Sequence, residues 1–147
     1  MKILILSDNH YKDLDIKNKY DYIIHAGDYG NMYEYLINNN ILFVSGNCDY
    51  LGERERIINI NNKKIFLTHG DKYRVKETMN SLYYKALSLK CDIVIFGHTH
   101  IPFCTLNDNI LFINPGAYKE GYYVIIKDDK ISFYRYDNKL NEINYRR

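Results

Sequence analysis

The sequence predicts an α/β fold in which two sheets pack together and helices cover their outer faces. In the first two thirds of the chain, short continuous apolar runs are separated by turns and helical patterns, which is typical of buried parallel strands. One long segment, 75–90, repeats apolar residues at helical spacing. From residue 103 onward, the pattern changes to apolar runs between turns, several of which alternate apolar and polar residues as half-exposed antiparallel strands do.

The first half of the chain is predicted to contain three buried strands, a short helix and a hairpin. Apolar runs that end in polar residues predict the strands, at 2–7, 22–25 and 41–44. Residues 31–39 predict the helix, with Asn31 as its N-cap. Residues 56–61 and 64–68, joined by an Asn-Asn-Lys turn, predict the hairpin.

The second half begins with the long helix at 75–90 and a further buried strand at 92–96. Four more strands are predicted at 103–106, 110–113, 122–127 and 130–136. The pattern after residue 137 predicts no element. We therefore expect one domain over residues 1–147, with a core at about 1–136 and a C-terminal tail at 137–147.

Length, composition and charge place the chain among globular proteins of one domain. Its 147 residues are 46% hydrophobic and 26% charged, which excludes disordered and fibrous classes. A net charge of +2 argues against an extended nucleic-acid surface. No apolar run approaches the roughly 20 residues of a membrane span, and the N-terminal run is too short for a signal peptide. The odd number of cysteines, three, favours reduced thiols and a cytoplasmic location.

Polar residues follow five of the predicted strands at their carboxyl ends, where α/β sheets bind ligands. A turn or a cap accounts for any one of them alone. Five strand ends that all carry metal-ligand residue types are not expected from turns and caps. In chain order, these residues are Asp8 and His10, Asp28, Asn47, His69, and His98 and His100.

These residue types suit hydrolysis of a phosphate ester on two divalent cations about 3.5–4 Å apart. A carboxylate can bridge two cations, and Asp28 is the natural candidate. Mixed nitrogen and oxygen ligands favour Mn, Fe, Zn, Co or Ni over Mg or Ca. Because only two of the ligands are carboxylates, two dications keep a formal excess of about two positive charges, which attracts phosphate and acidifies a bridging water.

The ordered set resembles the calcineurin-like metallophosphoesterase superfamily. Five stretches are similar to its small, single-domain YfcE-type phosphodiesterases, and the resemblance runs from Ile3 to about Tyr136. The stretches are His-Ala-Gly-Asp at 25–28, Ser-Gly-Asn-Cys-Asp at 45–49, Leu-Thr-His-Gly at 67–70, Phe-Gly-His-Thr-His-Ile-Pro at 96–102, and Asn-Pro-Gly at 114–116.

The resemblance implies a four-layer αββα sandwich of two mixed sheets, with two divalent metal ions at the strand ends, Mn being our expectation. One would be held by Asp8, His10, Asp28 and His100, and the other by Asp28, Asn47, His69 and His98. The implied reaction is in-line attack on phosphorus by a hydroxide that bridges the two metals. Asn47 would also orient the phosphate, so Asp28, Asn47 and His98 are the expected catalytic residues.

The chain departs from the superfamily pattern beside these motifs. Cys48 stands where many members carry a histidine that protonates the leaving oxygen, although the small phosphodiesterases often share the cysteine. A thiol is a weak hydrogen-bond donor with an ordinary pKa of about 8.5, so Cys48 is either a poor catalytic and substrate-binding replacement or a small packed residue. Asp49 either binds substrate or caps the next segment. Tyr11, where relatives carry glycine, either contacts substrate or packs.

The resulting expectation is a phosphodiesterase acting on a small diester. The alternatives, in order, are a phosphomonoesterase on the same site, a protein-binding scaffold like the retromer subunit with this fold, and a DNA-repair nuclease. Intact ligand positions favour an enzyme over the scaffold, and the low charge and short length disfavour the nuclease. The expected partners are a small phosphate ester and, by resemblance, a second copy of the chain in a homo-oligomer; neither a membrane nor extended nucleic acid is expected.

Overall fold

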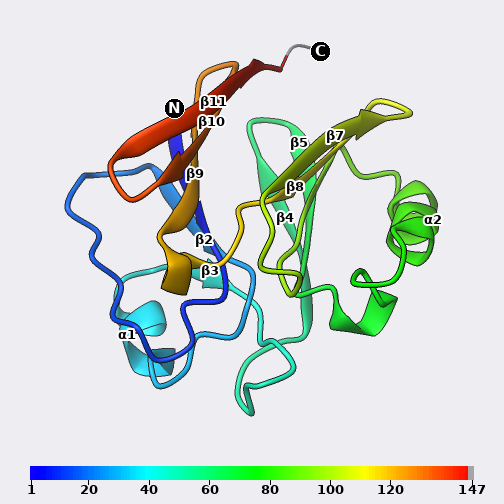
Figure 1. Ribbon diagram of the computed structural model, residues 1–147. Helices are drawn as coiled ribbons and strands as arrows, with labels where there is room; N and C mark the ends of the chain where they lie inside the picture. Colours follow the sequence, from blue (N-terminus) through cyan, green and yellow to red (C-terminus); the bar gives the residue numbers. More distant parts are fainter. Residues whose placement is uncertain (146–147) are drawn as a thin grey trace.

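The computed structural model describes residues 1–145 as two mixed sheets packed face to face, with one α-helix on each outer side (Figure 1). The predicted four-layer αββα sandwich is therefore confirmed. Helix α1 (Tyr33–Asn38) covers the first sheet, and helix α2 (Asn80–Leu89) covers the second. Among the described residues, no helix is long and apolar enough to cross a membrane.

The first sheet has six strands in the order β11-β10-β9-β1-β2-β3. Three of them are parallel, namely β1 (Lys2–Leu6), β2 (Tyr22–His25) and β3 (Leu42–Phe43). The other three form an antiparallel meander beside β1, namely β9 (Tyr122–Lys127), β10 (Lys130–Arg135) and β11 (Asn138–Asn144). The end of the chain thus returns to the sheet with which it began.

The second sheet has five strands in the order β4-β5-β6-β8-β7. Its parallel strands are β5 (Lys63–Thr68), β6 (Ile93–Ile95) and β8 (Ile110–Asn114). Antiparallel edge strands flank them, namely β4 (Glu55–Ile60) and β7 (Phe103–Asn107). Two short 3₁₀ helices, η1 (Asp71–Tyr73) and η2 (Tyr118–Glu120), follow β5 and β8.

Alternate residues of the central strands face different layers, which explains their continuous apolar runs. In β1, Ile3 and Ile5 pack between the two sheets, whereas Leu4 and Leu6 pack beneath α1. Strands of the second sheet divide their residues in the same way between the inter-sheet core and α2. Both faces of these strands are therefore buried, and no polar residue interrupts the run.

The predicted long helix is wrong at its start, because α2 begins at Asn80 instead of residue 75. The hydroxyl of Thr78 accepts the backbone N–H of Asn80 (3.2 Å), a local contact of the kind found where helices begin. Val75 and Met79 still pack against the α2 core from the preceding turn. The predicted cap of the first helix is also wrong, since Met32 occupies the N-cap position without a side-chain cap.

Most residues of the predicted C-terminal tail belong to the first sheet. Residues 138–144 form β11, which pairs with β10 along its length. All but one of the β11 residues are exposed, so the strand carries no burial pattern that a sequence reading can detect. The last two residues of the predicted tail, Arg146 and Arg147, lie outside the described residues.

Candidate metal centre

The carboxyl ends of the parallel strands in both sheets meet at one edge of the sandwich. Six predicted ligands are brought together there: Asp8 and His10 after β1, Asp28 after β2, His69 after β5, and His98 and His100 after β6. Residues from the first 30 positions thus contact residues near position 100. The sandwich, and not any single motif, creates the cluster.

Each of the two carboxylates has one oxygen bound by the protein and one that faces the histidines. The Ser7 hydroxyl and the His98 backbone N–H (3.1 Å) donate to Asp8 Oδ2. The Cys48 backbone N–H donates to Asp28 Oδ1 (2.9 Å). These contacts orient Asp8 Oδ1 and Asp28 Oδ2 towards the centre of the cluster.

The four histidines form two edge-to-face pairs. The rings of His10 and His100 have centroids 5.3 Å apart, with their Nε2 atoms at 3.4 Å. The rings of His69 and His98 have centroids 5.1 Å apart. His10 and His69, one from each pair, both lie within 3.9 Å of an oxygen of Asp8 and of Asp28.

The free carboxylate oxygens lie between the histidine nitrogens. Asp8 Oδ1 is 3.3 Å from His100 Nε2, 3.7 Å from His69 Nε2 and 3.9 Å from His10 Nε2. Asp28 Oδ2 is 3.2 Å from His69 Nε2 and 3.9 Å from His10 Nε2. Ligands of a tetrahedral cation with bonds of about 2.0–2.1 Å stand roughly 3.3 Å apart, so these spacings suit metal binding.

The protonation of His69 supports the same conclusion. Its Nδ1 lies 2.7 Å from the carbonyl oxygen of Ala26, so Nδ1 carries a hydrogen and Nε2 faces two carboxylates. His69 Nε2 and Asp8 Oδ1 are both buried without a hydrogen-bond partner. Two carboxylates and a ring nitrogen that face one another in a buried site require a positive charge between them, which either a proton on Nε2 or a bound metal ion supplies.

The pKa shifts follow from the same contacts. Burial raises the pKa of Asp28, but the hydrogen bond and charge of His69 outweigh burial and hold that pKa well below its ordinary value. Burial likewise opposes ionisation of Asp8, and contacts with His100 and His69 still lower its pKa. For His69, burial lowers the pKa, and the neighbouring carboxylates reverse the shift and raise it. Both carboxylates are therefore ionised and available as ligands at neutral pH.

The backbone of the site is strained. Five of the seven predicted ligands adopt the left-handed conformation, with φ of 54° at Asp8, 51° at His10, 59° at Asp28, 72° at His98 and 66° at His100. Non-glycine residues adopt this conformation uncommonly, at a cost of about 1–3 kcal/mol each, and such residues cluster at functional sites.

Two glycines allow the strand ends to approach the carboxylates. A Cβ on Gly46 would lie 2.2 Å from Asp28 Oδ1, and a Cβ on Gly97 would lie 2.0 Å from the Ser7 hydroxyl and 2.6 Å from Asp8 Oδ2. Both glycines are required by this close packing, since any side chain would displace a ligand carboxylate.

Sequence reasoning missed the buried residues that hold the ligand segments. The ring of His25 accepts the Gly27 N–H at Nδ1 (3.0 Å) and contacts Asn9 Oδ1 through Nε2 (2.7 Å). The Asn9 amide in turn donates to the carbonyl of Lys12 (2.8 Å). Burial lowers the pKa of His25 to about 4, so the ring stays neutral. The signal in the sequence was their place within the motifs, since His25 opens the 25–28 stretch and Asn9 stands between Asp8 and His10.

A second buried amide holds the His98 to His100 segment. Asn114 Nδ2 donates to the carbonyl of Gly97 and to the hydroxyl of Thr99, both at 3.0 Å. Its Oδ1 accepts the backbone N–H of Gly116 (2.9 Å). Asn114 therefore fixes the loop that carries two of the candidate ligands.

The remaining candidates lie around the cluster. Cys48 is exposed, and its sulfur lies within 4.8 Å of the ligand atoms of His10 and Asp28. The Asn47 amide contacts that sulfur at 3.8 Å, one side chain away from the cluster. Tyr11 is 79% exposed beside His10.

Asp49 binds the backbone of the Asp28 turn. Its carboxylate accepts the N–H groups of Gly46 (2.7 Å), Asp28 (2.8 Å) and Tyr29 (3.2 Å). These contacts are to backbone that precedes Asp49, so the structure gives the residue a role other than capping the next segment, and the substrate contact stays a prediction.

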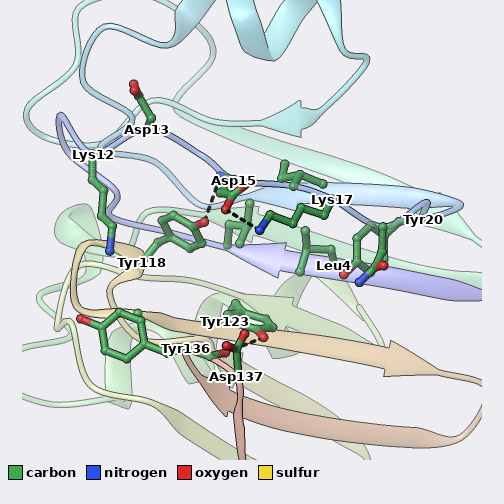
Figure 2. A pocket seen from close by; sticks show the side chains of 14 residues that line it. Leu4, Lys12, Asp13, Asp15, Lys17, Tyr20, Tyr118, Tyr123, Tyr136 and Asp137 are labelled. Carbon is green, nitrogen blue, oxygen red and sulfur yellow. Dashed lines mark hydrogen bonds and ion pairs between the residues drawn. The ribbon is translucent and has the colours of Figure 1, made fainter.

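A separate pocket of about 380 Å³ lies on the outer face of β1 and β9 (Figure 2). We call it the tyrosine pocket; its lining includes Leu4, Lys12, Asp13, Asp15, Lys17, Tyr20, Tyr118, Gly121, Tyr123, Tyr136 and Asp137. The ammonium of Lys12 lies over the rings of Tyr118 (5.7 Å) and Tyr136 (5.2 Å). None of the predicted site residues lines this pocket.

Comparisons with known proteins show the family of the chain. Residues 1–132 match a model of the calcineurin-like phosphoesterase superfamily domain. Probable metallophosphoesterase YsnB of Bacillus subtilis (strain 168) is 30% identical over 160 residues, covering 97% of this chain and 95% of that protein. Phosphodiesterase MJ0936 of Methanocaldococcus jannaschii is 33% identical over 148 residues, covering 79% of this chain and 83% of that protein.

A similar fold is found among solved structures. The crystal structure of a predicted phosphoesterase from Streptococcus pneumoniae TIGR4 has a TM-score of 0.80 and 25% sequence identity, and the match covers 97% of both chains. The match extends over both sheets and therefore includes the edge at which the candidate ligands meet.

Proposed function

The chain belongs to the calcineurin-like phosphoesterase superfamily, and from that premise we propose that it is a metal-dependent phosphodiesterase that hydrolyses a small diester. The observation that carries the proposal is the set of donor atoms at the strand ends. His69 Nε2 lies 3.2 Å from Asp28 Oδ2 and 3.7 Å from Asp8 Oδ1, and His69 Nε2 and Asp8 Oδ1 are buried without hydrogen-bond partners.

The proposed centre holds two divalent cations. The paired rings of His10 and His100 would serve one, and those of His69 and His98 would serve the other. Asp28 Oδ2 lies within 3.9 Å of a nitrogen from each pair, so Asp28 is the proposed bridge. Asn47 would complete the second set by a movement of its exposed side chain. Nitrogen and oxygen donors together favour a transition metal, and Mn is the metal we propose.

When bound, the cations would neutralise phosphate charge and acidify water enough to attack phosphorus at neutral pH. The protein's own contribution is orientation. The Ser7 hydroxyl and the His98 N–H hold Asp8, while the Cys48 N–H holds Asp28. Asp49 fixes the backbone of the Asp28 turn through three N–H groups, which makes it a proposed positioning residue.

The preference for a diester with a good leaving group rests on Cys48. Burial and then the charge of Asp28 raise the pKa of its thiol, so the thiol stays neutral at pH 7 and is a weak proton donor. The proposed substrate is therefore an ester whose leaving group departs without taking up a proton from the protein. A relative with 33% identity carries the name phosphodiesterase, which supports the same substrate class.

A metal-titrated turnover assay tests the proposal. The metal-free protein receives Mn, Ni, Co, Zn or Mg in turn, with bis-p-nitrophenyl phosphate and p-nitrophenyl phosphate measured side by side. We expect metal-dependent hydrolysis that favours the diester. A series of aryl diesters with increasing leaving-group pKa should then show steeply falling rates.

The other outcomes have distinct meanings. Preference for the monoester would replace the proposed substrate class while keeping the metal centre. Metal binding without turnover of either substrate would contradict the enzymatic role. Equal rates for aryl and alkyl esters would contradict the assignment of Cys48 as a weak proton donor.

A further inference from the structure

An apolar hollow of about 320 Å³ lies beside the candidate metal centre, between the segment that precedes α2 and the segment that joins β6 to β7. Only two of its lining side chains are polar, Lys76 and Thr99. We call it the apolar hollow; it is lined by Val75, Lys76, Met79, Phe96, Thr99, Ile101 and Phe103. Ile101 is 66% exposed and Phe103 is 37% exposed, so the rim presents apolar surface to solvent.

The wall of the apolar hollow is continuous with the segments that carry candidate ligands. Thr99 stands between His98 and His100, and its hydroxyl accepts the Ile101 N–H (3.1 Å). On the other side, a Cβ on Gly70, the residue after His69, would meet the Val75 side chain at 3.0 Å. The segments that carry His69, His98 and His100 therefore continue directly into the wall of the hollow.

Lys76 adds a positive charge to this wall. Its side chain is exposed at the rim of the hollow. The edge of the hollow at Lys76 is thus cationic, and most of the remaining wall is apolar.

We infer that the apolar hollow binds one ester group of the substrate and that this group is aromatic; the inference rests on the proposed function, since the phosphoryl group must occupy the centre. An anionic phosphate joined to an aromatic ring matches a cationic edge beside an apolar wall. The Met79 thioether and the Phe103 ring make favourable contacts with an aromatic guest. The volume lies at the small end of the range for small-molecule pockets.

A protein partner fits the apolar hollow less well. Stable protein interfaces use about 20–30 residues on each side, whereas the hollow is lined by seven. A small aromatic group needs no larger surface. The size of the site therefore favours part of a substrate as its occupant.

Binding of two phosphonates that differ only in their organic group tests the inference. Phenylphosphonate and methylphosphonate are titrated into the Zn-loaded protein labelled with ¹³C at methionine methyl groups, and both are tested as inhibitors of diester hydrolysis. We expect phenylphosphonate to bind about tenfold more tightly. It should also shift the Met79 methyl signal, while the Met32 signal on the far sheet stays unchanged.

Variants of the rim sharpen the test. Ile101→Ala should weaken the binding of phenylphosphonate roughly fourfold and leave that of methylphosphonate unchanged. The change removes three carbon atoms, but Ile101 lies on the rim, so the expected effect is that of burying about one methylene group. Leu106→Ala is the matched control, because Leu106 is a 53% exposed apolar residue on β7 outside the hollow.

The results separate the two proposals. If diesters are hydrolysed but both phosphonates bind equally and the Met79 signal does not move, the apolar hollow is not a substrate site and only this inference fails. If no diester is hydrolysed, the Met79 signal still decides whether an aromatic anion enters the hollow. Equal effects of Ile101→Ala and Leu106→Ala would also overturn the inference.

Discussion

The candidate metal centre and the tyrosine pocket both contain several charged side chains, but the exposure and the partners of these side chains differ between the two regions. In the tyrosine pocket, Asp15 pairs with Lys17 at 3.5 Å while its side chain stays 70% exposed. The Tyr118 hydroxyl accepts the Asp15 N–H (3.0 Å), and the Tyr123 hydroxyl donates to the Tyr136 carbonyl (2.7 Å) (Figure 2).

At the centre, the side chains of Asp8 and Asp28 are only 0% and 3% exposed, and one oxygen of each carboxylate faces histidine nitrogens. Buried polar groups are nearly always hydrogen-bonded in folded proteins, so a cluster of unpaired ones indicates a ligand that completes them. The comparison teaches that buried polar atoms without hydrogen-bond partners, here Asp8 Oδ1 and His69 Nε2, distinguish the candidate metal centre from the tyrosine pocket, whereas the volume of a pocket does not.

The largest expected effect comes from removing a charge at the centre. Asp28→Asn should lower metal-dependent turnover by about 10³-fold or more, because the metals contribute several kcal/mol to the reaction. Isothermal titration should show weaker metal binding as well. Asp13→Asn, which removes an exposed carboxylate from the tyrosine pocket, should leave both quantities unchanged. Retained activity in Asp28→Asn with excess metal would contradict the proposed mechanism.

A second prediction concerns pH, because a buried neutral histidine lies behind the centre. Unfolded His25 takes up a proton below its ordinary pKa of 6.5, whereas the folded protein does so only near pH 4. The unfolded state therefore binds more protons between these values, and stability should fall by roughly 3 kcal/mol as pH falls from 6.5 to 4.

Urea unfolding of the metal-free protein at several pH values measures this effect. Other groups titrate in the same range, so the quantity to follow is the difference between wild type and His25→Gln. That difference should shrink as pH falls. A constant difference would show that His25 does not stay neutral in the folded protein.

A third prediction uses two glycines, one in each region. Gly97→Ala would press a Cβ against Ser7 and Asp8, so activity should fall about 10- to 100-fold through displacement of a ligand. Gly121→Ala, at a left-handed turn lining the tyrosine pocket, would press instead on the Tyr136 ring at 2.7 Å. It should lower the free energy of unfolding by about 1–2 kcal/mol and leave the activity per folded molecule unchanged. Equal losses of activity in the two variants would erase the distinction between the regions.

The smallest expected effect is that of Tyr118→Phe in the tyrosine pocket. Its hydroxyl accepts one backbone hydrogen bond near the surface, so the variant should lose about 1 kcal/mol or less in urea unfolding. Turnover and metal affinity should match those of wild type. A loss of metal affinity would reveal coupling between the two regions, because the Tyr118 N–H also donates to the carbonyl of Ser7 (2.8 Å).

Much of the fold was predictable because its central strands are buried on both faces. The runs that became β1, β2 and β6 were found as strands, and β9 was found with its observed bounds. Strand β11 was missed because most of its residues are exposed. The start of α2 was placed too early because residues 75–79 contribute apolar side chains to the same core without forming a helix.

The candidate ligands were predictable as residue types at strand ends, but the residues that hold them were not. Asn9, His25 and Asn114 are ordinary polar residues until the fold buries them among backbone groups that need partners. The meander of β9 to β11 likewise gave no sign that it pairs with β1 in preference to the strands that precede it in sequence.

The sequence by itself determined the two-sheet architecture and the identity of the candidate ligands, because burial periodicity and residue chemistry are local properties. Only the tertiary structure decided which ligands face each other, which carboxylate oxygens remain free, and where the backbone adopts a left-handed conformation. These features depend on contacts between β1 and β6 segments about 90 residues apart, and such contacts exist only after both sheets have packed.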